Sequence, residues 1–328
     1  MSETLPSFSA DTLTAFAGIP AEMLNEVGKL VSFRRGKVRD VIDLGDRLVL
    51  VATDRLSAFD WVLGLVPHRG QILNQLSAWW FEKLSDIVAS HILQVPDANV
   101  AVVKKCDPLL VEVVVRGRLT GSTSTAIWTR YKSGERNIYG IDFPDGMKKN
   151  DLLPRPIVTP TTKATEGHDK PISEDRIVAT GLVEADLWHE VRNISLALFE
   201  RGQKIAGTAG LVLVDTKYEF GIDVNGQLTL IDEVHTPDSS RYWRRSTLQQ
   251  RLQAGLEPEN LDKELVRLAY AAQGYTGQGP PEPLSPELAT EASVAYRRVF
   301  EVLTGEQLQP ASYPANPRVD AVLKELVC

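Results

Sequence analysis

Two apolar runs joined by an Asn-Gly pair constrain the fold of this chain more than any other feature. The first run covers residues 210–224, and the second begins at Gln227 as QLTLIDEV. An Asn-Gly pair between such runs predicts a two-residue β-hairpin turn, because both residues tolerate a positive φ. Counting outward from a turn of that length places Glu219 directly opposite Asp232 on the neighbouring strand.

In that register Glu219 and Asp232 repel each other unless a cation lies between them. Asp215 and Lys217 share their face, because strand side chains alternate. A site with so few carboxylate ligands suits Mg²⁺ that also holds a substrate phosphate. The alternative is a surface hairpin whose acids point into water. Lys217 and, beyond the second strand, Arg241 favour a mixed-charge site instead.

The composition is that of an ordinary globular protein with room for two domains or one large one. The 328 residues are 43% hydrophobic and 24% charged, and no apolar run reaches membrane-spanning length. A net charge of −7 argues against a general nucleic-acid binder. The N-terminal stretch has no basic leader, and Cys106 and Cys328 have no metal-ligand spacing. We therefore expect a cytoplasmic protein without membrane or nucleic-acid partners.

Strand-like and helix-like patterns alternate in the manner of an α+β protein. The expected elements are an antiparallel meander at 30–60, a helix at 74–87, a strand at 109–115, and helices at 184–201, 244–275 and 287–303. Residues 133–176 are rich in Pro, Gly and Thr and lack periodicity, so we expect a long functional loop there.

Three polar segments are candidate anion sites, although no Walker A sequence and no GxGxxG after a strand is present. The basic turn RGKVRD can place backbone N–H groups and Lys37 against phosphates. RGRLTGSTS, which begins at Arg116, adds planar arginine groups and hydroxyls at the end of a strand. The third segment, residues 160–173, supplies two lysines, a histidine and acids. Taken singly, each segment is also typical of an ordinary turn, helix cap or loop.

Together these segments resemble one family, the SAICAR synthetases (phosphoribosylaminoimidazole-succinocarboxamide synthases) of purine biosynthesis. The matching stretches are RGKVRD, TDRLSAFD, VEVVVRGRLTGS, TKATEGHD, LVDTKYEFG and DEVHTPDSSRYW, in the family's order along most of the chain. The longer middle loop and the C-terminal tail are similar to the family's larger variant. The resemblance implies an α+β fold of two parts with a cleft between them, related to ATP-grasp enzymes and distantly to kinases.

The resemblance also implies the reaction. The family joins the carboxylate of the imidazole ribonucleotide CAIR to the amine of L-aspartate, and uses ATP and Mg²⁺ to do so. A carboxylate resists attack by an amine, so phosphorylation first makes an acyl phosphate, and the products are SAICAR, ADP and phosphate. The expected division is a β-rich ATP-binding domain at residues 1–115 and a larger α+β domain at 116–328 that binds substrate and metal.

The resemblance implies a role for each matching residue. The expected binding residues are Lys37, Arg39 and Glu112 for ATP; Glu219 and Asp232 for Mg²⁺; Asp60, Arg116, Ser122, Asp215, Lys217, Asp238 and Arg241 for CAIR; and His168, Asp169 and Lys170 for L-aspartate. Lys217 and Asp215 are also the expected catalytic residues. Glu233 points away from the site in the simple register, and the sequence does not identify the base that deprotonates aspartate.

Two other functions fit parts of the pattern. A small-molecule kinase would use the ATP and metal residues and stop after phosphoryl transfer. A non-catalytic nucleotide sensor on the same scaffold would be expected to lose Glu219, Asp232 or Lys217, and all three are present. A requirement for an amine acceptor distinguishes a ligase from either alternative.

Overall fold

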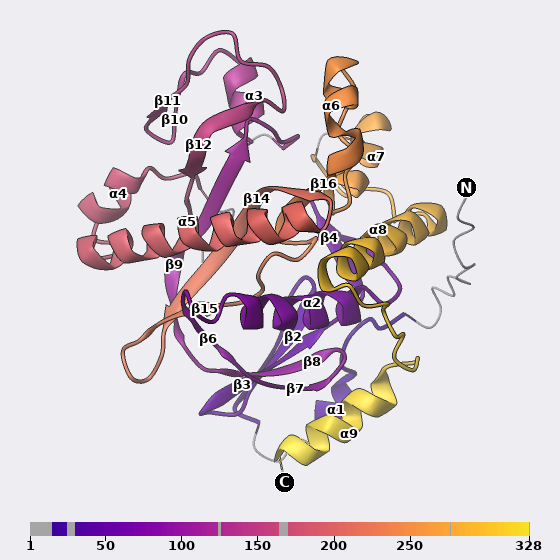
Figure 1. Cartoon of the computed structure of the whole chain (residues 1–328). Coiled ribbons are helices and arrows are strands. Elements are labelled where there is room, and N and C mark those ends of the chain that lie inside the picture. The colour runs from indigo at the N-terminus through magenta and orange to yellow at the C-terminus, as the bar shows by residue number, and fades with distance from the viewer. Residues whose placement is uncertain (1–14, 25–29, 124–125, 164–169, 276, 328) are drawn as a thin grey trace.

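An antiparallel five-stranded sheet, the N-terminal sheet, lies at one end of the molecule (Figure 1). The computed structural model describes residues 15–24, 30–123, 126–163, 170–275 and 277–327. In spatial order the strands are β1 (Ser32–Arg35), β2 (Arg39–Asp43), β3 (Arg47–Ala52), β8 (Val100–Lys104) and β7 (Ile92–Asp97). Buried Ile42, Val49 and Val51 pack against helix α9 (Asn316–Val327). The antiparallel meander expected from the sequence is confirmed over β1 to β3.

A seven-stranded sheet, the central sheet, carries the long strands that position the site. Its main path is β12 (Leu152–Val158), β9 (Asp107–Arg118), β14 (Leu211–Ile222), β15 (Leu228–Ile231) and β6 (Ala89–Ser90), with β13 (Thr161–Thr162) on β9 and β16 (Ser240–Arg244) on β14. Neighbouring strands are antiparallel except β15 and β6, which are parallel. Two further hairpins are β4–β5 (Arg55–Ala58 and Trp61–Leu65) and β10–β11 (Asn137–Ile138 and Ile141–Asp142).

Helices cover the central sheet and separate it from the N-terminal sheet (Figure 1). α5 (Ala185–Thr208) lies along β9 and β14 and buries Val191, Leu198 and Phe199. α2 (Arg69–Lys83) lies between the two sheets, and α8 (Pro286–Thr304) packs beside it. Further helices are α1 (Ala21–Leu24), α3 (Ile127–Lys132), α4 (Glu174–Ala179), α6 (Arg245–Gln253) and α7 (Glu264–Ala272). In the part of the chain that the structure describes, none of the helices is both long and apolar enough to cross a membrane.

The predicted register of the β14–β15 hairpin is wrong by one residue. Glu219 lies opposite Ile231 and not opposite Asp232, because the turn is longer than two residues. The Asp223 carboxylate accepts hydrogen bonds from the backbone N–H groups two and four residues later, at 2.9 and 3.1 Å, and Gly226 has a φ of 80°. An acid that caps its own turn, with glycine in the left-handed region, favours a three-residue loop.

The expected long loop at residues 133–176 contains strands, so that prediction is wrong in part. β12 pairs with β9 at the edge of the central sheet, although two prolines hide its pattern. Prolines are tolerated at an edge, where some backbone N–H groups need no partner. The helix expected at 244–275 is two helices, because Gly255 (φ 69°) and Pro258 interrupt it. The domain boundary expected at residue 115 lies inside β9.

Candidate functional site

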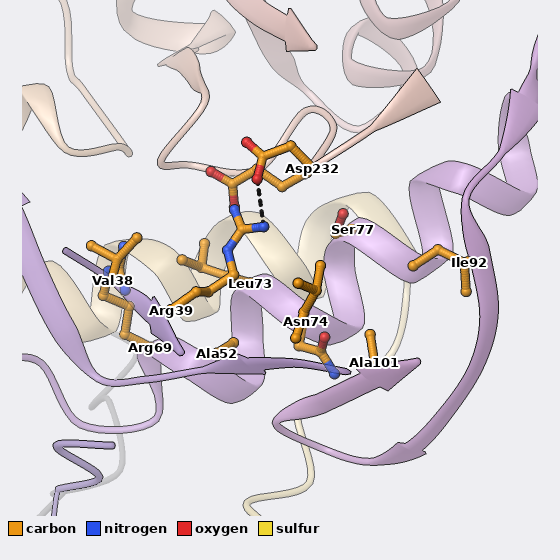
Figure 2. Close-up of a pocket in the computed structure, with 12 residues that line it drawn as sticks. Val38, Arg39, Ala52, Arg69, Leu73, Asn74, Ser77, Ile92, Ala101 and Asp232 are labelled. Atoms are coloured by element: carbon orange, nitrogen blue, oxygen red, sulfur yellow. Dashed lines mark hydrogen bonds and ion pairs between the residues drawn. The ribbon is translucent and has the colours of Figure 1, made fainter. Parts of the chain in front are cut away.

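A cleft of about 620 Å³ lies between the N-terminal sheet and the central sheet. Lys37 and Arg39 line it from the N-terminal side, and Lys217, Glu219 and Asp232 line it from the other. The structure therefore brings together five side chains that the sequence assigned to one site. A smaller pocket that shares Arg39 and Asp232 with the cleft is drawn in Figure 2, where the Arg39 side chain reaches Asp232.

Four acidic side chains gather at this meeting point, and we call them the carboxylate corner. They are Glu112, Glu219, Asp232 and Glu233. Lys217 Nζ lies between them, 3.4 Å from Glu112 and 3.3 Å from Asp232, and it also contacts Glu219. Glu219 has a second cationic partner in Lys163, which follows β13. The acids are thus held close together by amines.

Arg39 joins the N-terminal sheet to the carboxylate corner. Its Nη1 donates to Asp232 Oδ1 at 2.7 Å (Figure 2). Its Nη2 lies 3.2 Å from Glu233 Oε2. Glu233 therefore points toward the site, although the simple hairpin register placed it on the opposite face. The reason is the backbone of Asp232, whose φ of 69° ends β15 and turns the chain.

Glu219 and Asp232 do come together, but by a different route from the predicted cross-strand pairing. The cross-strand neighbour of Glu219 on β9 is Glu112, so two carboxylates do face each other across the sheet. Asp232 reaches the same place because of its left-handed backbone, and Lys217 contacts all three acids. Like charges in this arrangement repel unless cations lie among them.

The charges in the carboxylate corner set the protonation states. Burial alone would raise the pKa of Asp232, but the positive charges of Arg39 and Lys217 outweigh it and hold this pKa well below its usual range. Burial opposes the charged form of Lys217, yet Glu219, Asp232 and Glu112 together raise its pKa well above normal. Burial, opposed by Arg39, raises the pKa of Glu233. Asp232 and Lys217 are therefore an ion pair at neutral pH.

A second cluster, the arginine corner, consists of Arg116, Arg241 and Arg267 with Asp215 and Glu264. Asp215 on β14 lies in register with Arg116 on β9 and Arg241 on β16, so one carboxylate is flanked by two guanidinium groups. Arg116 Nη1 is 3.6 Å from Asp215 Oδ2, and Arg241 contacts Asp215 directly. This row of three adjacent strands fixes the arginines at the site.

Glu264, at the start of α7, ties the arginine corner together. Its carboxylate is 3.1 Å from both Arg241 and Arg267, and it accepts a hydrogen bond from Ser122 Oγ at 2.5 Å. Burial would raise the pKa of Glu264, but Arg241 and Arg267 lower it to about 2. Glu264 is therefore ionised, and the predicted residues Arg116, Ser122, Asp215 and Arg241 form one connected network.

The buried carboxylate of Asp238 contacts three side chains at once. Its Oδ2 lies 2.6 Å from Arg69 and 3.0 Å from Lys263, and Tyr296 donates to Oδ1 at 2.8 Å. Burial would raise the pKa of Asp238, but Arg69 and Lys263 hold it far below its usual range. Asp238 and Lys263 also line the cleft.

The remaining predicted residues lie at the rim or outside the described part of the chain. Lys37 pairs with Asp60, and both side chains are more than half exposed. Lys170 is exposed, and its backbone pairs with Thr162. His168 and Asp169, the other residues assigned to L-aspartate, lie outside the described residues.

Sequence reasoning missed several charged residues of the site. They are Arg69, Glu233, Lys263, Glu264 and Arg267. Lys163 was a candidate from the sequence, but its contact with Glu219 was not expected. Lys163 had a signal, because it lies in the polar segment at 160–173. Arg69 had none, since a fully buried arginine in the first turn of a helix follows no local pattern.

The carboxylate corner suits Mg²⁺ that is bound together with a substrate phosphate. Within the described ranges no three His, Cys, Asp or Glu side chains are arranged to hold a metal by themselves. Mg²⁺ is commonly bound through one or two carboxylates and the phosphates of a substrate, so Glu219 and Asp232 supply a sufficient donor set. Their present partners are the amines of Lys163 and Lys217 and the guanidinium group of Arg39, whose positive charge a bound cation would replace.

The comparisons with known proteins agree on one family. A family model described as SAICAR synthetase matches residues 32–281. A Legionella pneumophila (strain Lens) relative named phosphoribosylaminoimidazole-succinocarboxamide synthase is 49% identical over 284 residues, covering 86% of this chain and 90% of the relative. A solved structure described as SAICAR-synthase from Saccharomyces cerevisiae complexed with SAICAR has a TM-score of 0.72 at 29% identity, covering 86% of this chain and 97% of that one. A SAICAR synthetase (Type-2) in complex with ADP has a TM-score of 0.65 at 26% identity, covering 85% of this chain and all of the other.

Proposed function

The chain belongs to the SAICAR synthetase family, and from that premise we propose which substrates its cleft takes and which side chains hold them. It is an ATP-dependent ligase of purine biosynthesis that makes SAICAR, and neither a kinase nor a sensor function is favoured. The proposed substrates besides ATP are CAIR and L-aspartate. The proposed compartment is the cytoplasm, because two cysteines far apart in the sequence suit a reducing environment.

ATP is proposed to lie in the cleft with its phosphates toward the carboxylate corner. Lys37 and Arg39 line this part of the cleft, and Glu112 lies beside Lys217. Mg²⁺ would be held by Glu219 and Asp232, and when bound it would supply positive charge next to the triphosphate. Lys217 contacts both carboxylates, and with Arg39 it keeps Asp232 ionised by holding the pKa of that carboxyl well below its usual range.

CAIR is proposed to lie in the arginine corner. Arg116 and Arg241 offer planar groups suited to phosphate oxygens, and Ser122 adds a hydroxyl. Asp215 and Asp238 are proposed to contact the ribose or the base, with Asp60 near the rim. Lys217, two residues from Asp215 on the same strand, is proposed to bind the CAIR carboxylate between the two corners.

The proposed reaction has two steps. A carboxylate oxygen of CAIR bonds to the γ-phosphorus as the β–γ phosphate bond breaks and ADP leaves. The amine of L-aspartate then bonds to the acyl carbon, loses a proton and expels phosphate. The amine of a free amino acid is mostly protonated at neutral pH, so it must also give up a proton before it can attack. His168, Asp169 and Lys170 are proposed to place the aspartate, by resemblance alone.

The observation that supports this proposal most is the placement of an acid-rich and an arginine-rich cluster along one strand, β14. ADP release is measured with ATP, Mg²⁺ and CAIR, with and without L-aspartate. Sustained release and a new ultraviolet-absorbing product are expected only with L-aspartate. Undiminished ADP release without it would favour a kinase, and an unchanged rate in Asp169→Ala would remove the basis for the aspartate site.

A further inference from the structure

The basic turn between β1 and β2 directs its carbonyl groups toward the interior of the protein. The carbonyls of Gly36 and Lys37 accept hydrogen bonds from the Arg55 guanidinium group, at 3.0 and 3.2 Å. The next carbonyl, that of Val38, accepts from the backbone N–H of Thr53 at 3.2 Å and from its hydroxyl at 2.7 Å. Both donor residues are buried. Three successive carbonyls are therefore held on one side of the turn.

The opposite side of the turn carries N–H groups. The peptide groups of the turn are trans, and a trans peptide group directs its N–H away from its C=O. The N–H groups of Lys37 and Val38 therefore point away from Arg55. Gly36, Lys37 and Val38 line the cleft, whereas Arg55 is 8% exposed and is not among the described residues that line it. Successive backbone N–H groups in a turn can form an anion-binding concavity.

Arg55 is itself fixed by a buried acid and by the chain that precedes the N-terminal sheet. Its Nη2 donates to Asp40 Oδ1 at 2.7 Å, and its Nη1 donates to the carbonyl of Ala17. Asp40 Oδ2 accepts from the backbone N–H of Ile19 at 2.8 Å. Gly18 lies against this pair, and a Cβ there would overlap Arg55 Nη1 and Asp40 Oδ2. One guanidinium group thus joins the turn to a buried carboxylate and to the N-terminal chain.

We propose that Arg55 is a positioning residue that holds the turn with its N–H groups toward the cleft and so builds a backbone site for the phosphates of ATP. The proposal rests on the proposed function, in which the ATP phosphates lie beside Lys37 and Arg39. It gives a further role to the stretch TDRLSAFD, from which only Asp60 had been assigned one. Arginine suits this position because its planar group carries five N–H donors in fixed directions, whereas lysine carries three on one nitrogen.

Two variants separate this role from a general contribution to folding. Arg55→Lys keeps a positive charge beside Asp40, but its single nitrogen cannot serve that carboxylate and both turn carbonyls. Arg318→Lys is the matched control, because Arg318 also contacts a carboxylate, that of Asp97, and donates to a backbone carbonyl, that of Ser312 at 3.0 Å. In the part of the chain that the structure describes, Arg318 has no contact with the turn.

The test is calorimetric titration of each variant with ADP and with adenosine, both in EDTA, together with Tm. Adenosine has the same base and ribose but no phosphate, so its affinity does not depend on the turn. Arg55→Lys is expected to bind ADP roughly tenfold more weakly, as for the loss of one charge-assisted hydrogen bond, and to bind adenosine as the parent does. Arg318→Lys should lower Tm and leave the ratio of the two affinities unchanged.

Amide NMR distinguishes a failure of this inference from a failure of the proposed function. In the parent, the Lys37 and Val38 amide resonances should shift far more with ADP than with adenosine, and these shifts should be smaller in Arg55→Lys. Equal shifts with ADP and adenosine in the parent would refute the placement of the phosphates at the turn. Shifts that are specific to ADP in the parent, with equal shifts and equal ADP affinity in Arg55→Lys, would refute only the role of Arg55.

Equal losses of ADP and adenosine affinity in Arg55→Lys would also overturn the positioning role, because the whole site would then be disturbed. Should Arg55→Lys fail to fold, the double variant Arg55→Gln/Asp40→Asn takes its place, since it leaves neither partner as an unpaired buried charge. A roughly tenfold fall in its preference for ADP over adenosine is expected. A preference equal to that of the parent would show that Arg55 does not position the turn.

Discussion

The carboxylate corner and the arginine corner lie on the same strand but have opposite balances of charge. In the first, four carboxylates face three cationic side chains, Arg39, Lys163 and Lys217. In the second, three arginines face two carboxylates, Asp215 and Glu264. Asp215 and Glu219 are four positions apart on β14, which is about 13 Å at the usual rise of a strand. One strand can thus present a place for a cation and a place for an anion to the same cleft.

The difference shows how a ligase can hold two anionic substrates close together. A triphosphate and a phosphorylated ribonucleotide repel each other, and a uniformly basic cleft would bind either one anywhere. In the proposed assignment, opposite net charges instead give each ligand its own place, and Mg²⁺ is needed on one side only. Perturbing one corner should therefore affect one ligand, which the following predictions test in order of expected effect.

Asp232→Asn should nearly abolish turnover. Loss of an outer partner of a metal ligand costs 10- to 100-fold, so loss of a ligand should reduce the rate by roughly 100-fold or more. Tm should change little, because Asn tolerates a positive φ. In addition, Arg39 retains its ion pair with Glu233, and Lys217 retains its ion pair with Glu219. ADP release and thermal unfolding are measured together. Near-normal turnover at saturating Mg²⁺ would contradict the role of the carboxylate corner.

Arg241→Lys should weaken CAIR and leave ADP binding unchanged. A hydrogen bond to a charged group contributes about 1.5–3 kcal/mol, so the loss should be roughly 10- to 150-fold. Lysine keeps the positive charge beside Asp215 and Glu264 but loses the planar fork. Separate calorimetric titrations with CAIR and ADP check this.

Arg241→Ala is the comparison variant for that result. It leaves two buried carboxylates without their shared partner, which typically costs 3–5 kcal/mol of stability, so its Tm should fall clearly. Equal losses for CAIR and ADP in Arg241→Lys would mean that the two corners are not separate sites.

Much of the fold was predictable because it follows local patterns. The meander at β1 to β3 and the helices α2, α5 and α8 come from alternating or helical apolar spacing. Lys217 and Glu219 lie on the same face of β14, as the alternation of strand side chains predicted, since their side chains contact each other. These features could be predicted because they depend only on residues that are close in the sequence.

The parts that failed depend on side chains far away or on single turn residues. Asp223 lengthened the hairpin turn and shifted the register by one, which the Asn-Gly pair alone did not reveal. Glu219 and Asp232 nevertheless lie close together, because Asp232 has a left-handed backbone conformation and Lys217 contacts both carboxylates. Arg69 and Glu264 entered the site through tertiary packing, for which the sequence has no local signal.

Acid should loosen the segment that connects the two corners. His235 in that segment is fully buried, shares a hydrogen bond with Tyr218 at 2.5 Å and packs edge-on against Trp80. Burial lowers its pKa to about 3, whereas the unfolded chain would have about 6.5. The unfolded state therefore binds the proton first, and stability that is complete above pH 6.5 falls as pH decreases toward 3.

The expected slope from His235 is about 1.4 kcal/mol per pH unit in that window. Urea unfolding at pH 6.5, 5.5 and 4.5 measures it, and His235→Gln should make the slope shallower by about that amount. His189→Gln, at an exposed position, is the control and should leave the slope unchanged. An unchanged slope in His235→Gln would show that other groups, such as His91, carry the acid sensitivity.

Ser122→Ala should have the smallest effect and should separate two roles for this hydroxyl. Ser122 is exposed and donates to Glu264 at 2.5 Å. If the hydroxyl also binds the CAIR phosphate, its loss should cost about 1 kcal/mol, or roughly fivefold in CAIR affinity, with ADP affinity unchanged. Alternatively, the hydroxyl only restrains the Glu264 carboxylate, and its removal lets that carboxylate compete with the CAIR phosphate for Arg241 and Arg267. In that case Ser122→Ala should have no further effect once Glu264 is neutral. The double variant Ser122→Ala/Glu264→Gln should then bind CAIR as tightly as Glu264→Gln alone. Ser133→Ala, whose hydroxyl donates to Arg130 O, is the control. A Ser122→Ala variant that binds CAIR as tightly as the parent would remove Ser122 from the arginine corner, because neither role would then be needed.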